Sequence, residues 1–242
     1  MILILCSARD TSALAMRASL AAASAAPVDA VTTMELVTAP RLAQALGAEG
    51  CRNALTLRRL GPIDPRLLRG VLNRIDTLPE AHLMAMEASE RHYVLQELQA
   101  VLASWLRALP CPVVNRPTAA SLAGPTYHEA VWRHMAATAG LPVSERPLDP
   151  DQPDSASAAP TVSTVVFRGR CYGTVPPPPF GTAILALAAR SGADLLEVFL
   201  HAESDRGLVF SAATPFVALE RGGSPLVRDL AATFGAAPGA PA

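Results

Sequence analysis

The clearest helical periodicity of the chain lies near its middle, between residues 91 and 109. Apolar residues recur there at steps of three and four, at Leu95, Leu98, Leu102, Trp105 and Leu109. This spacing puts one stripe of side chains on a single face, so it predicts a helix packed against a core. Pro110 cannot continue a helix and marks its end.

A short strand and a second helix follow. The segment PVVN at 112–115 is apolar and β-branched, which is typical of a buried strand. Thr126 and Glu129 have the spacing of a capping box and predict a helix start, and Gly140 predicts a left-handed end. The spacing assigns the inner stripe of this helix to Tyr127, Val131, Met135 and Ala139.

Strands and helices alternate before this region. We predict strands at 2–6, 28–36, 52–57 and 71–75. We predict helices from Asp10 or Thr11 to about Ser24, over 38–46, and from a capping box at Thr77–Glu80 to a break near Ser89. This alternation is typical of a parallel sheet with right-handed crossovers, so we expect a Rossmann-like α/β domain.

The C-terminal part predicts a smaller α+β domain. A β-branched run at 161–167 and the segment 170–174 should form a hairpin that turns at Arg168 and Gly169. We then predict a helix at 180–191 ended by Gly192, strands at 194–200 and 207–212, and a helix at 225–234 ended by Gly235. Prolines 176–179 are interpreted as a rigid spacer, with recognition by a proline-reading domain as the alternative.

A polar segment separates the two halves. DPDQPDSASAAP at 149–160 contains small residues and prolines without periodicity, as linkers do. The predicted organisation is a Rossmann-like domain at 1–117, a connecting helix and strand at 118–148, a linker at 149–160, an α+β domain at 161–235 and a disordered tail at 236–242.

Residues 91–142 carry a family resemblance. The long helix, the phrase PCPVVNRP, the capped helix and AGLPVSE together resemble the junction between the N-terminal domain and the ATP-binding lobes of ATP-grasp proteins. The resemblance implies a Rossmann-like pre-ATP-grasp sheet followed by a smaller, truncated ATP-grasp-like α+β domain. Proteins of that family are ligases that activate a carboxylate as an acyl phosphate and transfer it to an amine or a thiol.

The chain departs from the metal-binding pattern of that family. The resemblance implies that LVFSAATP at 208–215 corresponds to the family's strand ending in EVNP, where Glu and Asn bind magnesium. Ala212 then stands at the Glu position and Thr214 at the Asn position, while Pro215 is retained. On the preceding strand, Phe199 falls at or next to the family's Asp. Glu197, two residues away on the same face, is left as a possible lone carboxylate.

The phosphate-binding groups of the family are also missing. The family uses two lysines on the phosphates, but all 20 basic residues of this chain are arginines. Arginine is bulkier and holds its donors in a fixed fork, so it does not easily replace lysine. Only the short linker stands where the family has a lysine-bearing strand and a glycine-rich loop. We therefore expect the nucleotide-binding lobe to be deleted.

Composition excludes several classes of function. The chain has 242 residues, 50% apolar and 17% charged, with a net charge of −1. This balance argues against nucleic acid and an anionic membrane as partners, and no apolar run is long enough to span a bilayer. The start MILILCSARD lacks a preceding basic region, so we interpret it as a buried strand and expect a cytoplasmic protein. Four isolated cysteines indicate neither zinc nor disulfides.

Two dipeptides and three further residues are the candidate ligand-binding groups. Asn73-Arg74 and Asn115-Arg116 each follow an apolar strand, and we expect them at the carboxyl edge of the sheet as a site for a small anion or substrate. The alternative is an Asn that closes a turn and an Arg paired with a carboxylate. Arg168, Arg170 and Glu197 are the candidates if phosphate and metal binding persist. No catalytic residue and no metal ligand is assigned.

The leading hypothesis is a non-catalytic ATP-grasp-like subunit for binding or assembly, accessory to a biosynthetic or maturation enzyme. It needs no cofactor, and it predicts a protein partner or a homo-oligomer that covers apolar surface left by the lost lobe. The competing hypothesis is an active ATP-dependent carboxylate-to-amine ligase that uses ATP and magnesium, with arginines in place of the lysines. A third possibility is a scaffold without any small-molecule pocket.

Overall fold

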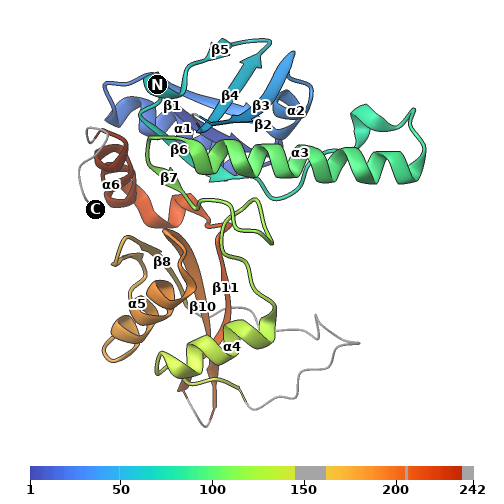
Figure 1. Ribbon diagram of the computed structural model, residues 1–242. Coiled ribbons are helices and arrows are strands. Elements are labelled where there is room, and N and C mark those ends of the chain that lie inside the picture. The colour runs from blue at the N-terminus through green and yellow to red at the C-terminus, as the bar shows by residue number, and fades with distance from the viewer. Residues whose placement is uncertain (49, 145–161, 205–206, 236–242) are drawn as a thin grey trace. The chain divides into compact units, whose positions relative to one another are not determined.

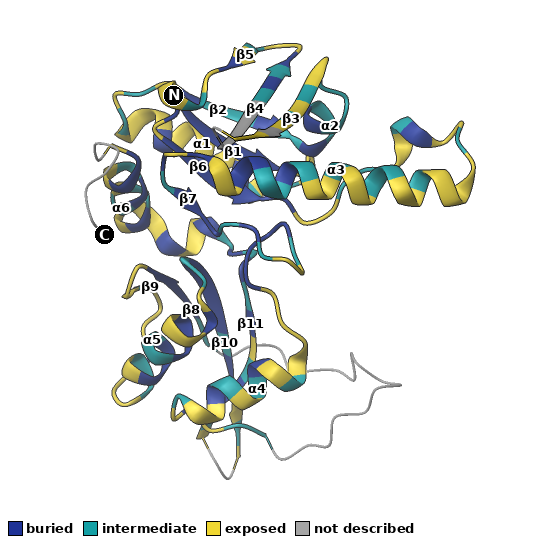
Figure 2. Ribbon diagram, in the orientation of Figure 1, coloured by how far each residue is buried: buried dark blue, intermediate teal, exposed yellow. Residues whose placement is uncertain are grey.

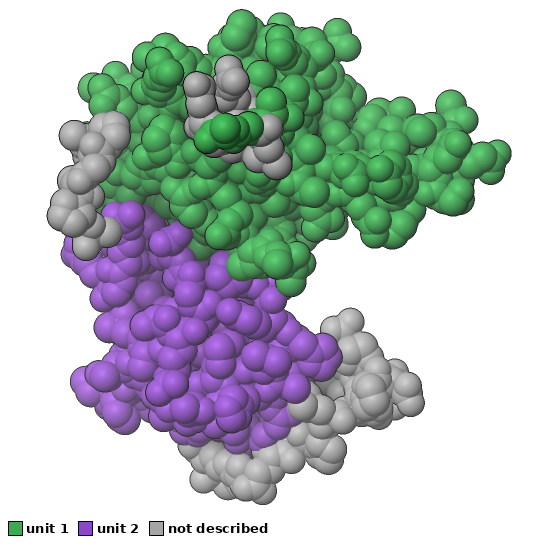
Figure 3. Space-filling model, in the orientation of Figure 1, with its two compact units in different colours: residues 1–124, 227–242 green, residues 125–226 purple. Residues whose placement is uncertain are grey.

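The computed structural model describes residues 1–48, 50–144, 162–204 and 207–235. The chain divides into two compact units, one of residues 1–124 with 227–242 and one of residues 125–226 (Figure 3). The predicted linker at 149–160 and the tail at 236–242 lie outside the described residues.

Unit 1 is built on a parallel sheet with the strand order β2-β1-β6-β7 (Figure 1). Its strands are β1 (Ile2–Cys6), β2 (Val28–Thr32), β6 (Gly70–Arg74) and β7 (Val113–Val114). Every residue of β1 is buried, as expected for a central strand between two parallel neighbours. Helix α1 (Thr11–Ala23) follows β1, and the Asp10 side chain caps it by accepting from the Ala13 backbone N–H.

The second predicted strand is too long. β2 ends at Thr32, where the chain turns into the short helix α2 (Thr33–Val37). Thr32 and Glu35 form a capping box, in which each side chain accepts from the other residue's backbone N–H. This local pair satisfies helix donors immediately, so the chain leaves the strand before the predicted end at residue 36.

The predicted helix at 38–46 is wrong. Residues of that segment form strand β3 (Arg41–Gly47), which pairs with β4 (Gly50–Leu57), and β4 pairs with β5 (Gly61–Ile63) in a separate antiparallel sheet. Burial alternates along the strand, because Leu42 and Gln44 are half-buried while Arg41, Ala43 and Ala45 are exposed. Gln44 also donates to Ser104 of the long helix. These non-local contacts outweigh the helix propensity of the Ala- and Leu-rich sequence.

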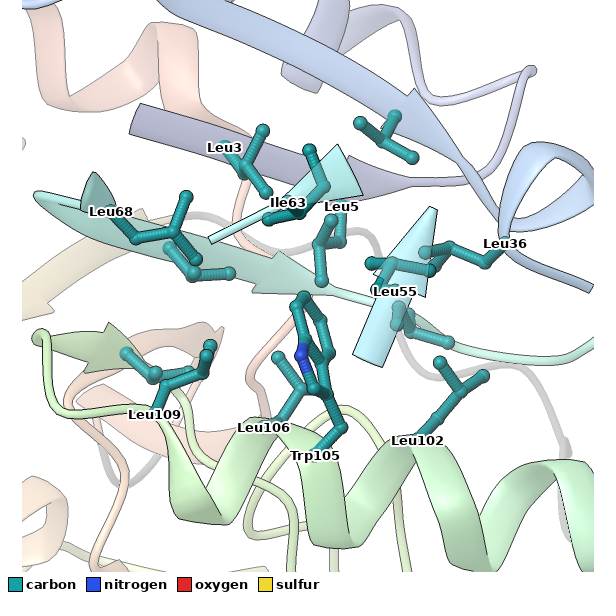
Figure 4. Close-up of a cluster of buried hydrophobic side chains, with 14 of the residues drawn as sticks. Leu3, Leu5, Leu36, Leu55, Ile63, Leu68, Leu102, Trp105, Leu106 and Leu109 are labelled. Carbon is teal, nitrogen blue, oxygen red and sulfur yellow. The ribbon is translucent and has the colours of Figure 1, made fainter. Parts of the chain in front are cut away.

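Helix α3 (Ala88–Ala108) confirms the long predicted helix, and its buried face lies at Leu102, Trp105 and Leu106. Figure 4 shows these side chains meeting leucines from the parallel sheet and from the antiparallel sheet around the Trp105 ring.

The predicted helix start at Thr77 is wrong. The chain there makes only the 3₁₀ turn η2 (Ala81–Leu83), because the periodic apolar stripe begins later than the capping-box pattern suggested.

Unit 2 contains an antiparallel sheet with the order β11-β10-β8-β9. Its strands are β8 (Val162–Phe167), β9 (Arg170–Gly173), β10 (Leu195–Glu203) and β11 (Gly207–Thr214). Helices α4 (Glu129–Thr138) and α5 (Phe180–Ser191) pack on the face that carries Leu196, Val198 and Leu200 (Figure 2). The hairpin, α5 and both C-terminal strands lie where the sequence predicted them.

The predicted cap of α4 is wrong, and its predicted inner stripe is confirmed only in part. His128, rather than Thr126, is the N-cap, and its Nδ1 accepts from the Ala130 backbone N–H at 3.3 Å. Met135 and Ala139 pack against the core as predicted, but Tyr127 and Val131 are exposed, and the fully buried residues are Trp132 and Ala136. The large indole ring has the most apolar area to remove from water, so the helix turns this side chain toward the core.

The remaining elements are the 3₁₀ turns η1 (Pro65–Leu67) and η3 (Leu219–Gly222) and helix α6 (Gly223–Gly235). Phe234 of α6 packs so closely on Gly70 that a Cβ at that glycine would lie 2.0 Å from the Phe234 ring.

The predicted fold class, a parallel α/β sheet followed by a smaller α+β part, is confirmed. Among the described residues, no helix is both long and apolar enough to cross a membrane.

Candidate functional site

The centre of the candidate site is one face of the β10–β11 pair in unit 2. In the antiparallel register, Phe199 pairs with Ala212 and Glu197 pairs with Thr214. Paired residues of an antiparallel ladder point to the same face, with Cβ atoms about 5 Å apart. Residues two apart on a strand also share a face, so all four side chains lie together. The two central positions, Phe199 and Ala212, are apolar.

Glu197 is a buried carboxylate with three hydrogen-bond donors. Only 1% of the residue is exposed. Oε1 accepts from the Ser163 hydroxyl of β8 and from Nη1 of Arg221 at 2.7 Å. Oε2 accepts from the Ala218 backbone N–H at 2.8 Å. These bonds compensate the cost of removing the charge from water.

Arg221 is held in place by both its side chain and its backbone. Its guanidinium lies 5.9 Å from the centre of the Phe199 ring while it donates to Glu197. Its carbonyl oxygen lies against β9, where a Cβ on Gly173 would come within 2.7 Å of it. Gly173 also has a φ of 76°, a conformation that favours glycine. A fixed cation therefore stands beside the carboxylate on this face.

This donor set does not fit a magnesium ion. Magnesium prefers oxygen ligands in an octahedral arrangement, but a phenyl ring and a methyl group occupy the paired positions at the centre of the face. The neighbouring carboxylate already binds a guanidinium, which would repel a divalent cation. Within the part of the chain that the structure describes, no three His, Cys, Asp or Glu residues are grouped as metal ligands.

Arg168 lies in the turn between β8 and β9, and Arg170 begins β9. Arg168 has a φ of 45° and Gly169 a φ of 73°, as the two central residues of a tight hairpin turn require. The Arg168 guanidinium lies over the Phe167 ring and that of Arg170 over the Tyr172 ring, each at 5.8 Å. Through the strand register, Arg170 shares the face of Glu197. Among the residues that the structure describes, the Glu197 carboxylate accepts hydrogen bonds from Ser163, Ala218 and Arg221.

The structure brings Asn73 and Asn115 together in unit 1, where both are buried. The Asn73 amide donates to the backbone oxygens of Asn115 at 2.8 Å and Leu122 at 2.6 Å. Asn115 has a φ of 57°, a left-handed conformation that asparagine tolerates. This geometry closes the loop that follows β7.

Arg74 and Arg116 have different partners. Arg74 is 6% exposed, and its Nε donates to the Asp10 carboxylate at 2.7 Å. Arg116 donates to four backbone oxygens at the end of α3 and in the following turn, those of Leu106, Arg107, Leu109 and Cys111. Both cations are therefore bound within unit 1.

The thiol at the carboxyl end of β1 is poorly suited to nucleophilic chemistry. Burial raises the pKa of Cys6 to about 11, and the nearby Asp10 charge adds to this shift although Arg74 opposes it. Burial likewise raises the pKa of Cys111 and Cys171. At neutral pH such thiols are protonated, so they act as small apolar side chains.

Sequence reasoning identified Glu197 but missed its partners. Arg221 is 24 positions away along the chain and Ser163 is 34 positions away, on a different strand. Ser163 stands opposite Phe199 in the observed register of β8 and β10, and no sequence motif specifies that register. Arg221 lies in η3, and no local motif indicates that this segment folds back on the sheet.

Comparisons with known proteins agree with this architecture. No family model and no curated protein matches the sequence. The solved structure of the macrocyclase MdnC bound with precursor peptide MdnA, from Microcystis aeruginosa MRC, matches with a TM-score of 0.71 and 11% identity, covering 96% of this chain and 99% of that chain. The macrocyclase MdnB from the same organism matches with a TM-score of 0.63 and 13% identity, covering 96% and 98%.

The ATP-grasp ligase PsnB, complexed with a minimal precursor, Mg and ADP, matches with a TM-score of 0.64 and 14% identity over 96% of this chain and 98% of that chain. At these identities the likeness concerns the fold alone. The chain therefore has an ATP-grasp-like fold, as the resemblance at residues 91–142 implied.

Proposed function

We propose that this chain is a non-catalytic ATP-grasp-like subunit that acts beside a peptide-maturation enzyme. The observation that supports this most strongly is the pairing of Phe199 with Ala212 where the resemblance implies metal ligands. A phosphoryl transfer needs cationic side chains on the phosphates, and it needs protein ligands that hold the magnesium ions. Here the chain has no lysine, and its buried carboxylate binds Arg221.

Peptide maturation is favoured by the solved structures of similar fold. MdnC was solved with a precursor peptide, and PsnB with a minimal precursor. A chain that keeps this fold without the ligand set can still offer a surface to a precursor or to the enzyme that modifies it. The proposal therefore names a protein or peptide as the partner, in a complex or in a homo-oligomer, and it needs no cofactor.

Isothermal titration of the full chain with ATP and magnesium tests the loss of catalysis. We expect no heat of binding at micromolar nucleotide and no formation of ADP in a coupled assay. Binding in the micromolar range, or turnover to ADP, would refute the proposal.

A pull-down from the native host, read by mass spectrometry, tests the partner, and recovery of a peptide-modifying enzyme or its precursor is the expected result.

The alternative is an active ligase in which arginines bind the phosphates. Arg170 supports it to the extent that it lies on the same face as Glu197. This alternative predicts that Arg170→Ala abolishes ATP turnover while the far-ultraviolet circular dichroism stays unchanged. Under the leading proposal, neither the wild type nor this variant turns over ATP.

A further inference from the structure

Glu197 joins a short segment to the sheet at two points. Ala218 donates its backbone N–H to Oε2, and Arg221 donates its guanidinium to Oε1. Between them runs η3, whose Leu219 is 1% exposed. The segment 218–222 is therefore bound to strand β10 of the same unit through a buried carboxylate, and Arg221 places a cation beside that carboxylate.

We propose that Arg221 is a built-in counter-cation that neutralises Glu197 and closes this face of unit 2 to divalent metal ions. This inference concerns the same face as the proposed function, but it makes a separate claim, about stability rather than about partners or turnover.

Three features of the contact support the proposal. The Glu197 side chain is 2% exposed, so its charge is screened little by water and needs a partner within the protein. The Arg221 side chain is 46% exposed, so its own charge keeps contact with solvent while Nη1 bonds the carboxylate. The Arg221 guanidinium lies 5.9 Å from the centre of the Phe199 ring, and the close approach of Gly173 to the Arg221 carbonyl oxygen fixes the backbone from which the side chain extends.

Removing the guanidinium should leave a buried carboxylate that lacks a counter-charge. A divalent cation with its own waters could then take the vacated volume and bind the carboxylate and the Ser163 hydroxyl. Magnesium should therefore stabilise an Arg221→Ala variant and have no effect on the wild type. Removing the carboxylate as well, in Glu197→Gln/Arg221→Ala, should abolish this response.

The test is thermal unfolding of the full chain, followed by circular dichroism with and without about 10 mM magnesium chloride, a concentration above the millimolar dissociation constants of weak oxygen-ligand sites. We expect Arg221→Ala to lower Tm by about 5 °C or more. Magnesium should restore part of that loss in the single variant only. Arg221→Lys, which keeps the charge, should stay insensitive to magnesium and remains informative if the alanine variant fails to fold.

Two results would overturn the inference. One is a magnesium-dependent rise in Tm of the wild type or of Arg221→Lys, which would mean that the face accepts a metal with the cation in place. The other is an Arg221→Ala variant as stable as the wild type and indifferent to magnesium. The second result leaves the proposed function untouched, whereas the first would also weaken its argument from missing metal ligands. The ATP titration and the partner search test the proposed function separately, so the two failures remain distinguishable.

Discussion

At the C-terminus of α3, a single arginine satisfies backbone oxygens that a helix end leaves without partners. Arg116 donates to the carbonyls of Leu106 and Arg107 through Nη1, and to those of Leu109 and Cys111 through Nη2. Its positive charge also complements the negative end of the helix dipole. The geometry favours the interpretation in which this side chain organises the turn between α3 and β7.

Arg116→Ala should therefore destabilise unit 1 without altering its surface chemistry. Hydrogen bonds to charged groups contribute about 1.5–3 kcal/mol, so we expect a loss of about that size in the free energy of unfolding. Urea denaturation followed by Trp fluorescence measures it, since Trp105 lies in the same helix. Arg58→Ala is the matched control, because Arg58 is exposed, and it should change the free energy by less than about 0.5 kcal/mol. Equal losses in the two variants would contradict the assignment.

At the scale of elements, hydrogen bonds of the Glu35 side chain connect α2 with the end of β2 and with Arg59, which follows β4. Glu35 completes the capping box with Thr32 and accepts from Nε of Arg59 at 3.2 Å, while Arg59 also donates to Asp29 of β2 at 2.8 Å. Burial by itself raises the pKa of Glu35, but the hydrogen bonds from Thr32 and Arg59 outweigh it, and the net pKa is lowered from 4.5.

The lowered pKa fixes the sign of a pH dependence. A carboxyl that ionises more easily in the folded state stabilises the fold above its unfolded pKa, and this stabilisation is lost as the pH falls through the folded pKa. Glu35→Gln keeps a capping-box side chain but has no charge to titrate. We expect the variant to be less stable than the wild type at pH 7, with the difference shrinking below the ordinary value of 4.5. Urea denaturation at a series of pH values measures this, and a difference that is constant with pH would contradict it.

The elements that the sequence predicted well are those specified by local signals. The β8–β9 hairpin has its Arg-Gly turn, α5 has its apolar face and its Gly192 stop, and α3 has a long periodic stripe. The errors fall where distant contacts decide. β3 is a strand because of β4 and the Gln44–Ser104 bond, and α4 is rotated because Trp132 reaches a core made by α5 and β10. The Glu197–Arg221 pair belongs to the same class.

At the scale of the whole molecule, the fold and the chemistry have separate requirements. The ATP-grasp-like architecture depends on apolar patterning that tolerates 11–14% identity to MdnC and PsnB. Phosphoryl transfer depends on a few charged side chains in fixed places. The architecture is retained in this chain, while Phe199 and Ala212 are paired where the resemblance implies metal ligands, and this combination favours the proposal of a scaffold used for binding.

This separation predicts that metal binding can be restored more easily than nucleotide binding. In a Phe199→Asp/Ala212→Glu variant, the register should place two carboxylates side by side on one face of the β10–β11 pair, within reach of one ion. We expect the variant to bind manganese in the millimolar to submillimolar range, as oxygen-ligand sites of modest charge do, with binding strengthened when Arg221→Ala is added. Electron paramagnetic resonance of free manganese measures this, and the wild type serves as the control.

The same variant should still fail to bind ATP. The chain contains no lysine, and the family resemblance implies that two lysines hold the phosphates, so we expect the phosphates to lack these cations. Calorimetry with ATP in the presence of manganese should therefore show the heat of metal binding alone. If nucleotide binding returned with the two carboxylates, the loss of metal ligands would be the sole barrier to activity, and the arginines would have to serve as phosphate ligands after all.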